Sequence, residues 1–416
     1  MFGVDSWRTE RIYISLLATI QFIHIVDFVI LMPLGPTLMN ELNVGPAQFA
    51  SLVSSYNFSA AISGLLFSAI ADRFDRKRLL LVSMIGFSCG AYLCAMASGF
   101  EALLSARIIT GSFGGVLTAI VYAIVSDLIP YKRRGRAMGV IMSAFSLASV
   151  LGIPLGLWVA DTFGWQKTFI LVGSFNLLLL GVSHIIFPTL SECIIRRKPV
   201  DMLKQYLAIL SRKRYIASHL FMFLIGGSMF LLIPFLSPYA VRNIGIATTD
   251  LKYMYLVAGI FTIVTARLIG HLTDRFGPVK VFTFLGLFSS IPIYFYTNAG
   301  PMGLVGYISL SVFFMSVVSG RMIPCMTYLS EIPNPEDRGS FMGILNAVRS
   351  LGSATATLIG GLIIVEGSDG GKLSGFDHVG YLSIMMITFT VIFIHFLKPR
   401  KNKDSPIIPP QNIRDF

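Results

Sequence analysis

The sequence SAIADRFDRKR, residues 68–78, is a short charged segment between two long apolar runs. A related segment, GHLTDRFGPVK at residues 270–280, also separates two apolar runs, and both segments contain Asp-Arg-Phe. Further matches follow in the same order: Ser126-Asp127 with Ser330-Glu331, Arg134-Gly135 with Arg338-Gly339, and Met138-Gly139 with Met342-Gly343. The chain is therefore predicted to contain two copies of one structural unit.

The composition places both units in a membrane. Of 416 residues, 54% are hydrophobic and only 13% are charged, whereas soluble domains carry about 25% charged residues. Runs of about 20 apolar residues can cross a bilayer as helices. Such runs are expected near residues 12–35, 48–70, 79–98, 102–126, 137–159, 168–188, 216–238, 252–272, 279–297, 302–327, 341–364 and 379–397. The predicted fold class is all-α integral membrane, with twelve transmembrane helices in two six-helix bundles related by a pseudo-twofold axis.

The longest polar interruption divides the chain into its expected parts. Residues 1–188 are predicted to form the N-terminal bundle and residues 215–397 the C-terminal bundle, joined by a basic linker at 189–214. Residues 398–416 are predicted to form a tail. The first apolar run is long, contains His24 and Asp27, and has no convincing cleavage site, so it is expected to remain as the first span.

The basic residues predict the orientation. Most of the 33 lysines and arginines fall in segments on the side of the amino terminus, and the loops of the other side carry only Lys167, Arg242, Lys252 and Lys372. Both termini and the linker are therefore expected in the cytoplasm. This distribution accounts for the net charge of +12, so no nucleic-acid partner is expected. The four cysteines lack ligand spacing, which favours packing over a disulfide or a metal site.

Asp27 is the clear carboxylate inside a predicted span. An ionised acid near the middle of a membrane is costly, which makes Asp27 a candidate proton carrier. Arg107 is expected at a similar depth in the fourth span and could pair with it. The pair could couple proton movement to conformation, or could be a static contact that fixes helix packing. His24 shares a helix face with Asp27 and could relay a proton, bind substrate, or simply be buried within the bundle.

Three further arginines lie inside predicted spans, namely Arg267, Arg321 and Arg349. Central placement costs about 2.5 to 3.5 kcal/mol for each arginine, so each needs a compensating interaction. Arg321 and Arg349 could bind an anionic or zwitterionic substrate, or could bond to helix carbonyls; snorkelling suits Arg267. The predicted substrate cavity consists of Arg321, Arg349, Met229, Phe230 and Met315.

These features resemble the major facilitator superfamily over all twelve spans. The two charged segments resemble the signature of that family between spans two and three, in which glycines flank the Asp-Arg core. The second copy keeps Gly270 and Gly277, whereas the first has Ser68 and Asp75 in their places. Because glycine reaches positive φ without the penalty that aspartate incurs, the first turn is not required to close as tightly as the second.

Two more motifs point to one branch of the family. Residues 107–115, RIITGSFGG, resemble its span-four motif, and residues 152–156, GIPLG, resemble a shortened form of its antiporter motif. Together with Phe163-Gly164-Trp165 and Phe169, this passage is similar to the drug/proton antiporter-1 branch, which includes arabinose-type sugar exporters. The resemblance implies a proton-coupling role for Arg107. The residues expected to let helices pack closely are Gly111, Gly115, Gly152, Pro154 and Gly156.

Charged residues at the inner helix ends form a candidate cytoplasmic gate. Opposite charges there can form ion pairs that close this side and break when the bundles rock, or they can be solvated anchors. The gate residues are Asp72, Arg73, Arg76, Asp127 and Arg134 in the first half and Asp274, Arg275, Glu331 and Arg338 in the second.

The sequence thus predicts a secondary transporter of a bacterial inner membrane that exports a small organic molecule by proton antiport. The alternatives are an uptake symporter or a facilitator for an organic anion and, outside transport, a receptor that moves nothing. An enzyme is disfavoured, because no nucleophile triad, metal cluster or phosphate loop is present. No cofactor is expected. The predicted partners are the substrate, protons and the lipid bilayer, and the predicted state is a monomer.

Overall fold

The computed structural model describes residues 7–68, 74–188, 209, 211–334, 337–367 and 371–397. In the first half the helices are α1 (Trp7–Ile30), α2 (Gly35–Glu41), α3 (Pro46–Ser68), α4 (Arg76–Met96), α5 (Phe100–Leu128), α6 (Tyr131–Leu147), the π-helix η2 (Ala148–Gly152), α7 (Ile153–Phe163) and α8 (Trp165–Ile186).

The second half has the same alternation of long helices. Its elements are α10 (Lys213–Phe230), η4 (Ile233–Phe235), α11 (Leu236–Tyr239), η5 (Ala240–Ile244), η6 (Thr248–Asp250), α12 (Leu251–Phe276), α13 (Pro278–Phe288), α14 (Ser290–Thr297), α15 (Leu304–Gly320), α16 (Met322–Ser330), α17 (Arg338–Ile363), β1 (Val365–Glu366), β2 (Leu373–Ser374) and α18 (Phe376–Ile394). The two short strands pair antiparallel, with Val365 opposite Ser374.

Eleven helices in the described part of the chain are long and apolar enough to cross a membrane, some of them built from consecutive elements such as α6, η2 and α7. The remaining predicted span is α17, which has 26 residues but a more polar sequence. The predicted architecture of twelve helices in two bundles is confirmed. Polar residues in a membrane-spanning helix face the interior of the protein because lipid does not solvate them. The polarity of α17 therefore indicates an interior position.

Proline breaks two spans of the second half. Proline lacks an N–H group, and its ring clashes with the carbonyl four residues earlier. Pro324 accordingly separates α15, which ends at Gly320, from α16. Pro292 similarly separates α13 from α14, with Ser289 between them. Both breaks place a polar residue inside the bundle, where it becomes part of the site described below.

The two charged turns of the repeat differ in backbone geometry. Gly277 has φ +85° and connects α12 directly to α13. Asp75, at the equivalent place in the first half, has φ −62° and caps the N-terminus of α4. Its carboxylate accepts hydrogen bonds from the backbone N–H groups of Lys77 at 2.7 Å and Arg78 at 3.1 Å. Aspartate therefore does not imitate the glycine conformation at this turn but stabilises the following helix as an N-cap.

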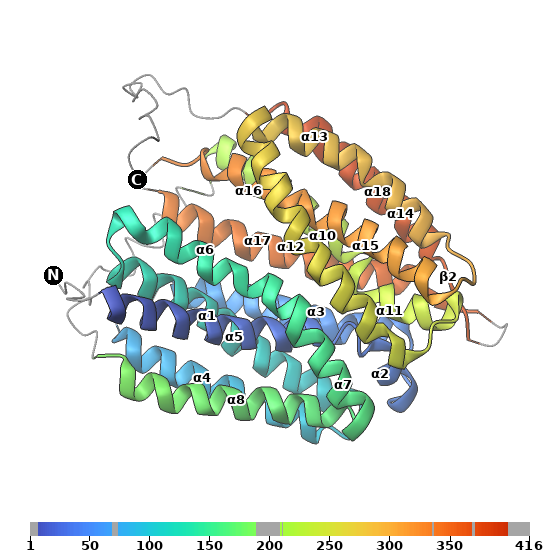
Figure 1. Cartoon of the computed structure of the whole chain (residues 1–416), viewed down its shortest axis with the longest axis horizontal. Coiled ribbons are helices and arrows are strands. Elements are labelled where there is room, and N and C mark those ends of the chain that lie inside the picture. The colour runs from blue at the N-terminus through green and yellow to red at the C-terminus, as the bar shows by residue number, and fades with distance from the viewer. Residues whose placement is uncertain are drawn as a thin grey trace.

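The two halves lie side by side, with their helices along the long axis of the molecule (Figure 1). We call the end that holds the start of α1 and the end of α18 the terminal side, and the end that holds α2 and β2 the distal side. Between the halves, α3 packs along α17, and α12 packs against η2 and α7. These helices form the interface on which any relative movement of the bundles depends.

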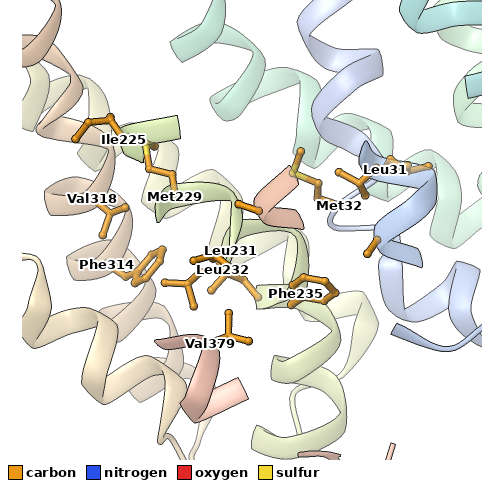
Figure 2. Close-up of a cluster of buried hydrophobic side chains, with 14 of the residues drawn as sticks. Leu31, Met32, Ile225, Met229, Leu231, Leu232, Phe235, Phe314, Val318 and Val379 are labelled. Carbon is orange, nitrogen blue, oxygen red and sulfur yellow. The ribbon is translucent and has the colours of Figure 1, made fainter. Parts of the chain in front are cut away.

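The distal part of the interface is closed. Lys252 Nζ on α12 lies 3.2 Å from Asp161 Oδ2 on α7, and Arg242 donates to the Asn40 side chain at 3.3 Å. One apolar cluster continues from Leu31 and Met32 of the first half into the second half (Figure 2). Its members in the second half that Figure 2 labels are Ile225, Met229, Leu231, Leu232, Phe235, Phe314, Val318 and Val379.

The terminal end of helix α3 is more exposed than its distal end. Phe49 and Ala50 near its distal end are fully buried, whereas Ile62 is 53% and Leu66 is 67% exposed near its terminal end. The same change occurs along α12, where Met254 is buried and Val264 is exposed. Burial at the interface is therefore concentrated on the distal side.

Candidate functional site

A fully buried ion pair lies at the centre of the first half. Arg107 Nη1 on α5 donates to Asp27 Oδ2 on α1 at 2.8 Å, and neither side chain has any exposed surface. A second guanidinium nitrogen, Nη2, lies 3.4 Å from the Asp27 backbone oxygen. The structure thus brings together the two residues that the sequence singled out as a pair.

Tyr56 on α3 and His24 on α1 complete this cluster. The Arg107 guanidinium carbon lies 4.5 Å from the centroid of the Tyr56 ring, a cation–π contact in a dry environment. The Tyr56 hydroxyl is 2.7 Å from His24 Nε2. His24 stands three residues before Asp27, so both side chains point from the same face of α1. The cluster therefore joins three helices around one positive and one negative charge.

Several polar atoms of the cluster have no hydrogen-bond partner among the described residues. These buried atoms are Asp27 Oδ1, Arg107 Nε and His24 Nδ1. Buried polar atoms are normally hydrogen-bonded, and exceptions point to strain, function or a missing ligand. Asp27 can therefore accept a proton on Oδ1 without first losing a hydrogen bond there.

Close contacts at glycine allow the helices to approach around the cluster. A Cβ at Gly114 would lie 2.5 Å from the Tyr56 hydroxyl and 2.6 Å from His24 Nε2, so only glycine leaves room for this pair. Gly111 and Gly115 likewise meet the backbone of α3, with the Tyr56 and Ala60 carbonyl oxygens 2.6 and 2.1 Å from the hypothetical Cβ atoms. The span-four motif thus sets the distance between α3 and α5.

The motif of the fifth span packs against α1. A Cβ at Gly152 would lie 2.2 Å from Val26, and one at Gly156 would lie 2.7 Å from Ile30. Pro154 lies in the first turn of α7, directly after the π-helix η2. Because proline lacks an N–H group, it cannot bond back to the preceding turn of this continuous span, which accounts for the interruption of the α-helical pattern at η2. This motif therefore fixes the segment of α1 that carries Asp27.

Phe28 connects the cluster to the second half. Its ring stacks on Tyr56 at a centroid distance of 5.2 Å and on Phe230, at the end of α10, at 6.0 Å. Phe28 is also the chain neighbour of Asp27. A shift of the Asp27 segment would therefore move an aromatic contact between the two halves.

The second half buries a different arginine. Arg321, at the break between α15 and α16, has no exposed surface and donates to Ser289 Oγ at 3.2 Å and Ser228 Oγ at 3.0 Å. Within the described residues it forms no ion pair, and its Nε atom has no hydrogen-bond partner. Arg321 lies where the two proline breaks meet. It therefore bonds to side chains between helices of its own bundle.

The other residues of the predicted substrate cavity lie in different environments. Met229 is 9% exposed and belongs to the apolar cluster of Figure 2. Met315 and Phe230 are half-buried and pack against the same cluster. Arg349 is half-buried near the middle of α17. Of the two arginines predicted to contact substrate, only Arg349 keeps accessible surface.

The predicted gate of the first half is partly described. Arg76 Nε lies 3.1 Å from Asp127 Oδ2, which joins the start of α4 to the last turn of α5. Arg134 Nε donates to the Ile129 backbone oxygen at 2.9 Å. Asp72 and Arg73 lie outside the described residues. The formed ion pair is a contact within one half.

The second half shows no matching pair among the described side chains. Asp274, Arg275 and Glu331 are exposed, and Arg275 lies 5.2 Å from the Phe276 ring centroid. Arg338 begins α17, but its side chain is not described. The proposed gate role of this group stays a prediction.

Two ion pairs at equivalent places of the repeat were missed by the sequence interpretation. Arg133 at the start of α6 lies 3.0 Å from Glu10 of α1. In the second half, Asp337 at the start of α17 pairs with Arg212, the residue before α10. Arg133 and Asp337 each stand directly before the repeated Arg-Gly pair. In each half, an ion pair therefore joins the first span to the fifth. The acid is on the first span in the first half and on the fifth span in the second half.

Tyr215 completes the second of these contacts. Its hydroxyl donates to Asp337 Oδ2 at 3.1 Å and lies 3.4 Å from Arg212. The hydrogen bond to Tyr215 and the nearby Asp337 carboxylate raise the pKa of Arg212 above its ordinary value. These contacts therefore favour the charged form of Arg212.

Tyr56 and Phe28 were also not predicted to belong to the site. Tyrosine and phenylalanine in an apolar run can pack against lipid or against neighbouring helices, so their residue types gave no signal. Only the structure shows that Tyr56 belongs to the site, because the rotation of α3 directs its ring toward Arg107.

Two bundles of membrane-spanning helices, with a buried ion pair beside their interface, define a two-bundle secondary transporter. The comparison with family models identifies the family. The model of the Major Facilitator Superfamily matches residues 17–217 and again residues 218–412. The chain belongs to this family, and the two matches correspond to the two halves. Its relatives are transporters, and enzymatic activity is not a property of the family.

Two curated relatives are named for multidrug resistance and for sugar efflux. The chain is 24% identical over 416 aligned positions to a multidrug resistance protein, MdtG, of Proteus mirabilis, covering 95% of this chain and 98% of the relative. It is 22% identical to a probable sugar efflux transporter of Mannheimia succiniciproducens, covering 94% and 96%. Among solved structures, a D-xylose–proton symporter matches with a TM-score of 0.76 at 17% identity, covering 95% of this chain and 99% of the other. The structural likeness shows the fold.

Proposed function

We propose that this multi-pass membrane transporter exports a small organic molecule in exchange for protons, by alternating access. The observation that carries the proposal is the buried Asp27–Arg107 pair, in which one carboxylate oxygen is left open. The relatives named for multidrug resistance and sugar efflux support the direction. The bacterial relatives and the distribution of basic residues support a bacterial inner membrane with both termini in the cytoplasm.

With the terminal side in the cytoplasm, the closed distal side faces outward, and we assign the structure to an inward-facing state. The ion pair Lys252–Asp161 and the apolar cluster then close the outer entrance. Opening that entrance requires the bundles to rock about α3–α17 and α12–α7, which breaks these contacts. The gate residues on the terminal side are proposed to form their closing pairs in that second state.

Asp27 is proposed to carry the proton. An ionised Asp27 holds Arg107 by charge and by hydrogen bond, whereas a protonated Asp27 no longer offers a full counter-charge. The Tyr56 ring remains under the guanidinium in either state and partly compensates for the loss. Binding of a proton thus loosens α1 from α5 without expelling the arginine from its place.

The loosening of α1 from α5 is proposed to affect the second half through Phe28. Since this ring stacks on both Tyr56 and Phe230, a shift of α1 alters the stacking between the two halves. The proton and the substrate would then favour different arrangements of the bundles, which is the requirement for exchange. His24, bonded to Tyr56, is proposed to relay protons to the cluster.

The test measures proton flux. Proteoliposomes with a pH-sensitive dye inside are exposed to antibiotics, sugars and organic anions, with wild-type protein beside Asp27→Asn. Under the proposal, at least one compound moves protons opposite to itself, and Asp27→Asn abolishes this proton flux while substrate binding persists. Protons that run with the compound would instead establish a symporter. Substrate flux without protons would leave the pair a static contact.

A further inference from the structure

We propose that Arg349 binds the anionic group of the transported molecule, so that the substrates are organic anions with a carboxylate, sulfonate or phosphate. This inference rests on the proposed transport function and names its substrate class. Arg349 lies near the middle of α17, the polar span that packs along α3 of the other half and along α10 of its own half. The side chain therefore lies beside the interface at which a two-bundle transporter binds its substrate.

The stem of Arg349 is held between helices. A Cβ at Gly226 of α10 would lie 2.7 Å from the Arg349 backbone oxygen and 3.0 Å from its Cγ, so glycine is needed for this close contact. Across the interface, Tyr122 of α5 is an electrostatic neighbour of the guanidinium. The Arg349 guanidinium therefore lies near groups of both halves.

The charge of Arg349 is not neutralised by the surrounding described residues. Helices α3, α10 and α17 contain no aspartate or glutamate. The acids of α5 are Glu101 in its first turn and Asp127 in its last, and Asp127 pairs with Arg76. Within the described part of the chain, the Arg349 guanidinium forms no ion pair or hydrogen bond, although a desolvated cation requires a counter-charge. An anion brought by the substrate supplies it.

The other intramembrane arginines do not share this combination. Arg107 already has Asp27, and Arg321 has no accessible surface and two serine partners. Arg267 is exposed on α12. Among these arginines of the described chain, Arg349 alone combines partial burial beside the α3–α17 contact with the lack of a counter-charge. The planar guanidinium fork matches the geometry of carboxylate and phosphate oxygens, which fits the proposed ligand class.

Charged thiol reagents test the site without a known substrate. Tyr122→Cys is placed in a chain whose four native cysteines are replaced by serine, and the protein is reconstituted in phosphatidylcholine vesicles. The measured quantity is the labelling rate with the anionic reagent sulfonatoethyl methanethiosulfonate divided by the rate with the cationic trimethylammonioethyl reagent. This ratio is expected to be about tenfold higher in the protein that keeps Arg349 than in the same protein with Arg349→Gln. Arg349→Lys should keep the preference, and Arg267→Gln should not change it.

Several results would overturn the proposal. One is a cysteine at 122 that reacts with neither reagent, and another is a reagent preference that Arg349→Gln leaves unchanged. Added phosphatidylglycerol that blocks the anionic reagent would show that a lipid headgroup, not a transported solute, occupies the site. Transport limited to neutral or cationic compounds would also overturn it. If no compound moves protons, the proposed antiport fails while the labelling result still decides the anion site, so the two failures are distinguishable.

Discussion

Each half of the transporter buries one arginine completely, and the two halves stabilise it differently. Arg107 has a carboxylate at 2.8 Å and an aromatic ring at 4.5 Å from its guanidinium carbon. Arg321 has two serine hydroxyls at 3.0 and 3.2 Å and, among the described residues, no acid. Both arrangements satisfy part of the guanidinium, but only the first contains a group that a proton can neutralise.

Because of this difference, the first arrangement can respond to protonation, whereas the second can only hold its helices together. A charge pair changes its interaction energy when one partner is protonated, because the counter-charge disappears. A guanidinium held by hydroxyl dipoles has no such second state near neutral pH. The first half is therefore suited to proton coupling. In the second half, the hydrogen bond from Arg321 to Ser289 connects the break between α15 and α16 to the break between α13 and α14. Four sets of variants test this distinction.

The largest effect is expected for Arg107→Gln. It leaves the Asp27 carboxylate buried without its counter-charge, and breaking a buried pair in this way costs about 3 to 5 kcal/mol of stability. Unfolding of the purified protein in detergent, followed by circular dichroism, measures the loss. The double variant Asp27→Asn/Arg107→Gln should recover most of it, because neither charge is then unpaired. A double variant that is as unstable as Arg107→Gln would show that the pair is not the cause.

Gly114→Ala should perturb the same cluster by steric contact. The new Cβ meets the Tyr56 hydroxyl at 2.5 Å and His24 Nε2 at 2.6 Å, and overpacking of this kind costs about 1 to 3 kcal/mol. Gly139→Ala is the matched control, because no atom lies within 4 Å of its Cβ. The free energy of unfolding should fall for the first variant only. Equal effects of both would mean that helix propensity, not the contact, determines the result.

Comparing Tyr56→Leu with Tyr56→Phe distinguishes the role of the ring from that of the hydroxyl. Leucine removes the cation–π contact with Arg107, which is worth about 0.5 to 2 kcal/mol. Phenylalanine keeps that contact and removes the hydrogen bond to His24. We expect Tyr56→Leu to lower stability more than Tyr56→Phe, and Tyr56→Phe to slow proton flux. The reverse order of stability would argue against the ring as a partner of the charge.

Arg321→Met should have the smallest effect on stability. Replacing a buried charge by an apolar side chain is often neutral or stabilising, and we expect a change within about 1 kcal/mol. The two serines stay satisfied, because Ser228 Oγ also donates to the Ile225 oxygen at 2.9 Å and Ser289 Oγ to the Gly286 oxygen at 2.7 Å. The pH dependence of transport should match that of wild type. A variant as unstable as Arg107→Gln would remove the distinction between the halves.

The sequence predicted which residues are costly to bury, because the free-energy cost of a charge within an apolar run follows from the neighbouring residues of the chain. It identified Asp27, Arg107, Arg321 and Arg349, and it predicted the pairing of the first two from their similar depth. It could not separate Arg321 from Arg349, since both lie within apolar runs that lack an acid. The structure separates them by burial, which depends on how neighbouring helices cover each face.

The sequence by itself determined the membrane class, the twelve spans and the repeat of six helices, because hydrophobic length and motif order are properties of the chain alone. Only the tertiary structure decided that Tyr56 lies on Arg107, that Phe28 reaches Phe230, and that Asp337 pairs with Arg212. Contacts between segments far apart in the sequence depend on the rotation and crossing of whole helices. That rotation is set by close packing at residues such as Gly114 and Gly226, and so it exists only once the helices have assembled.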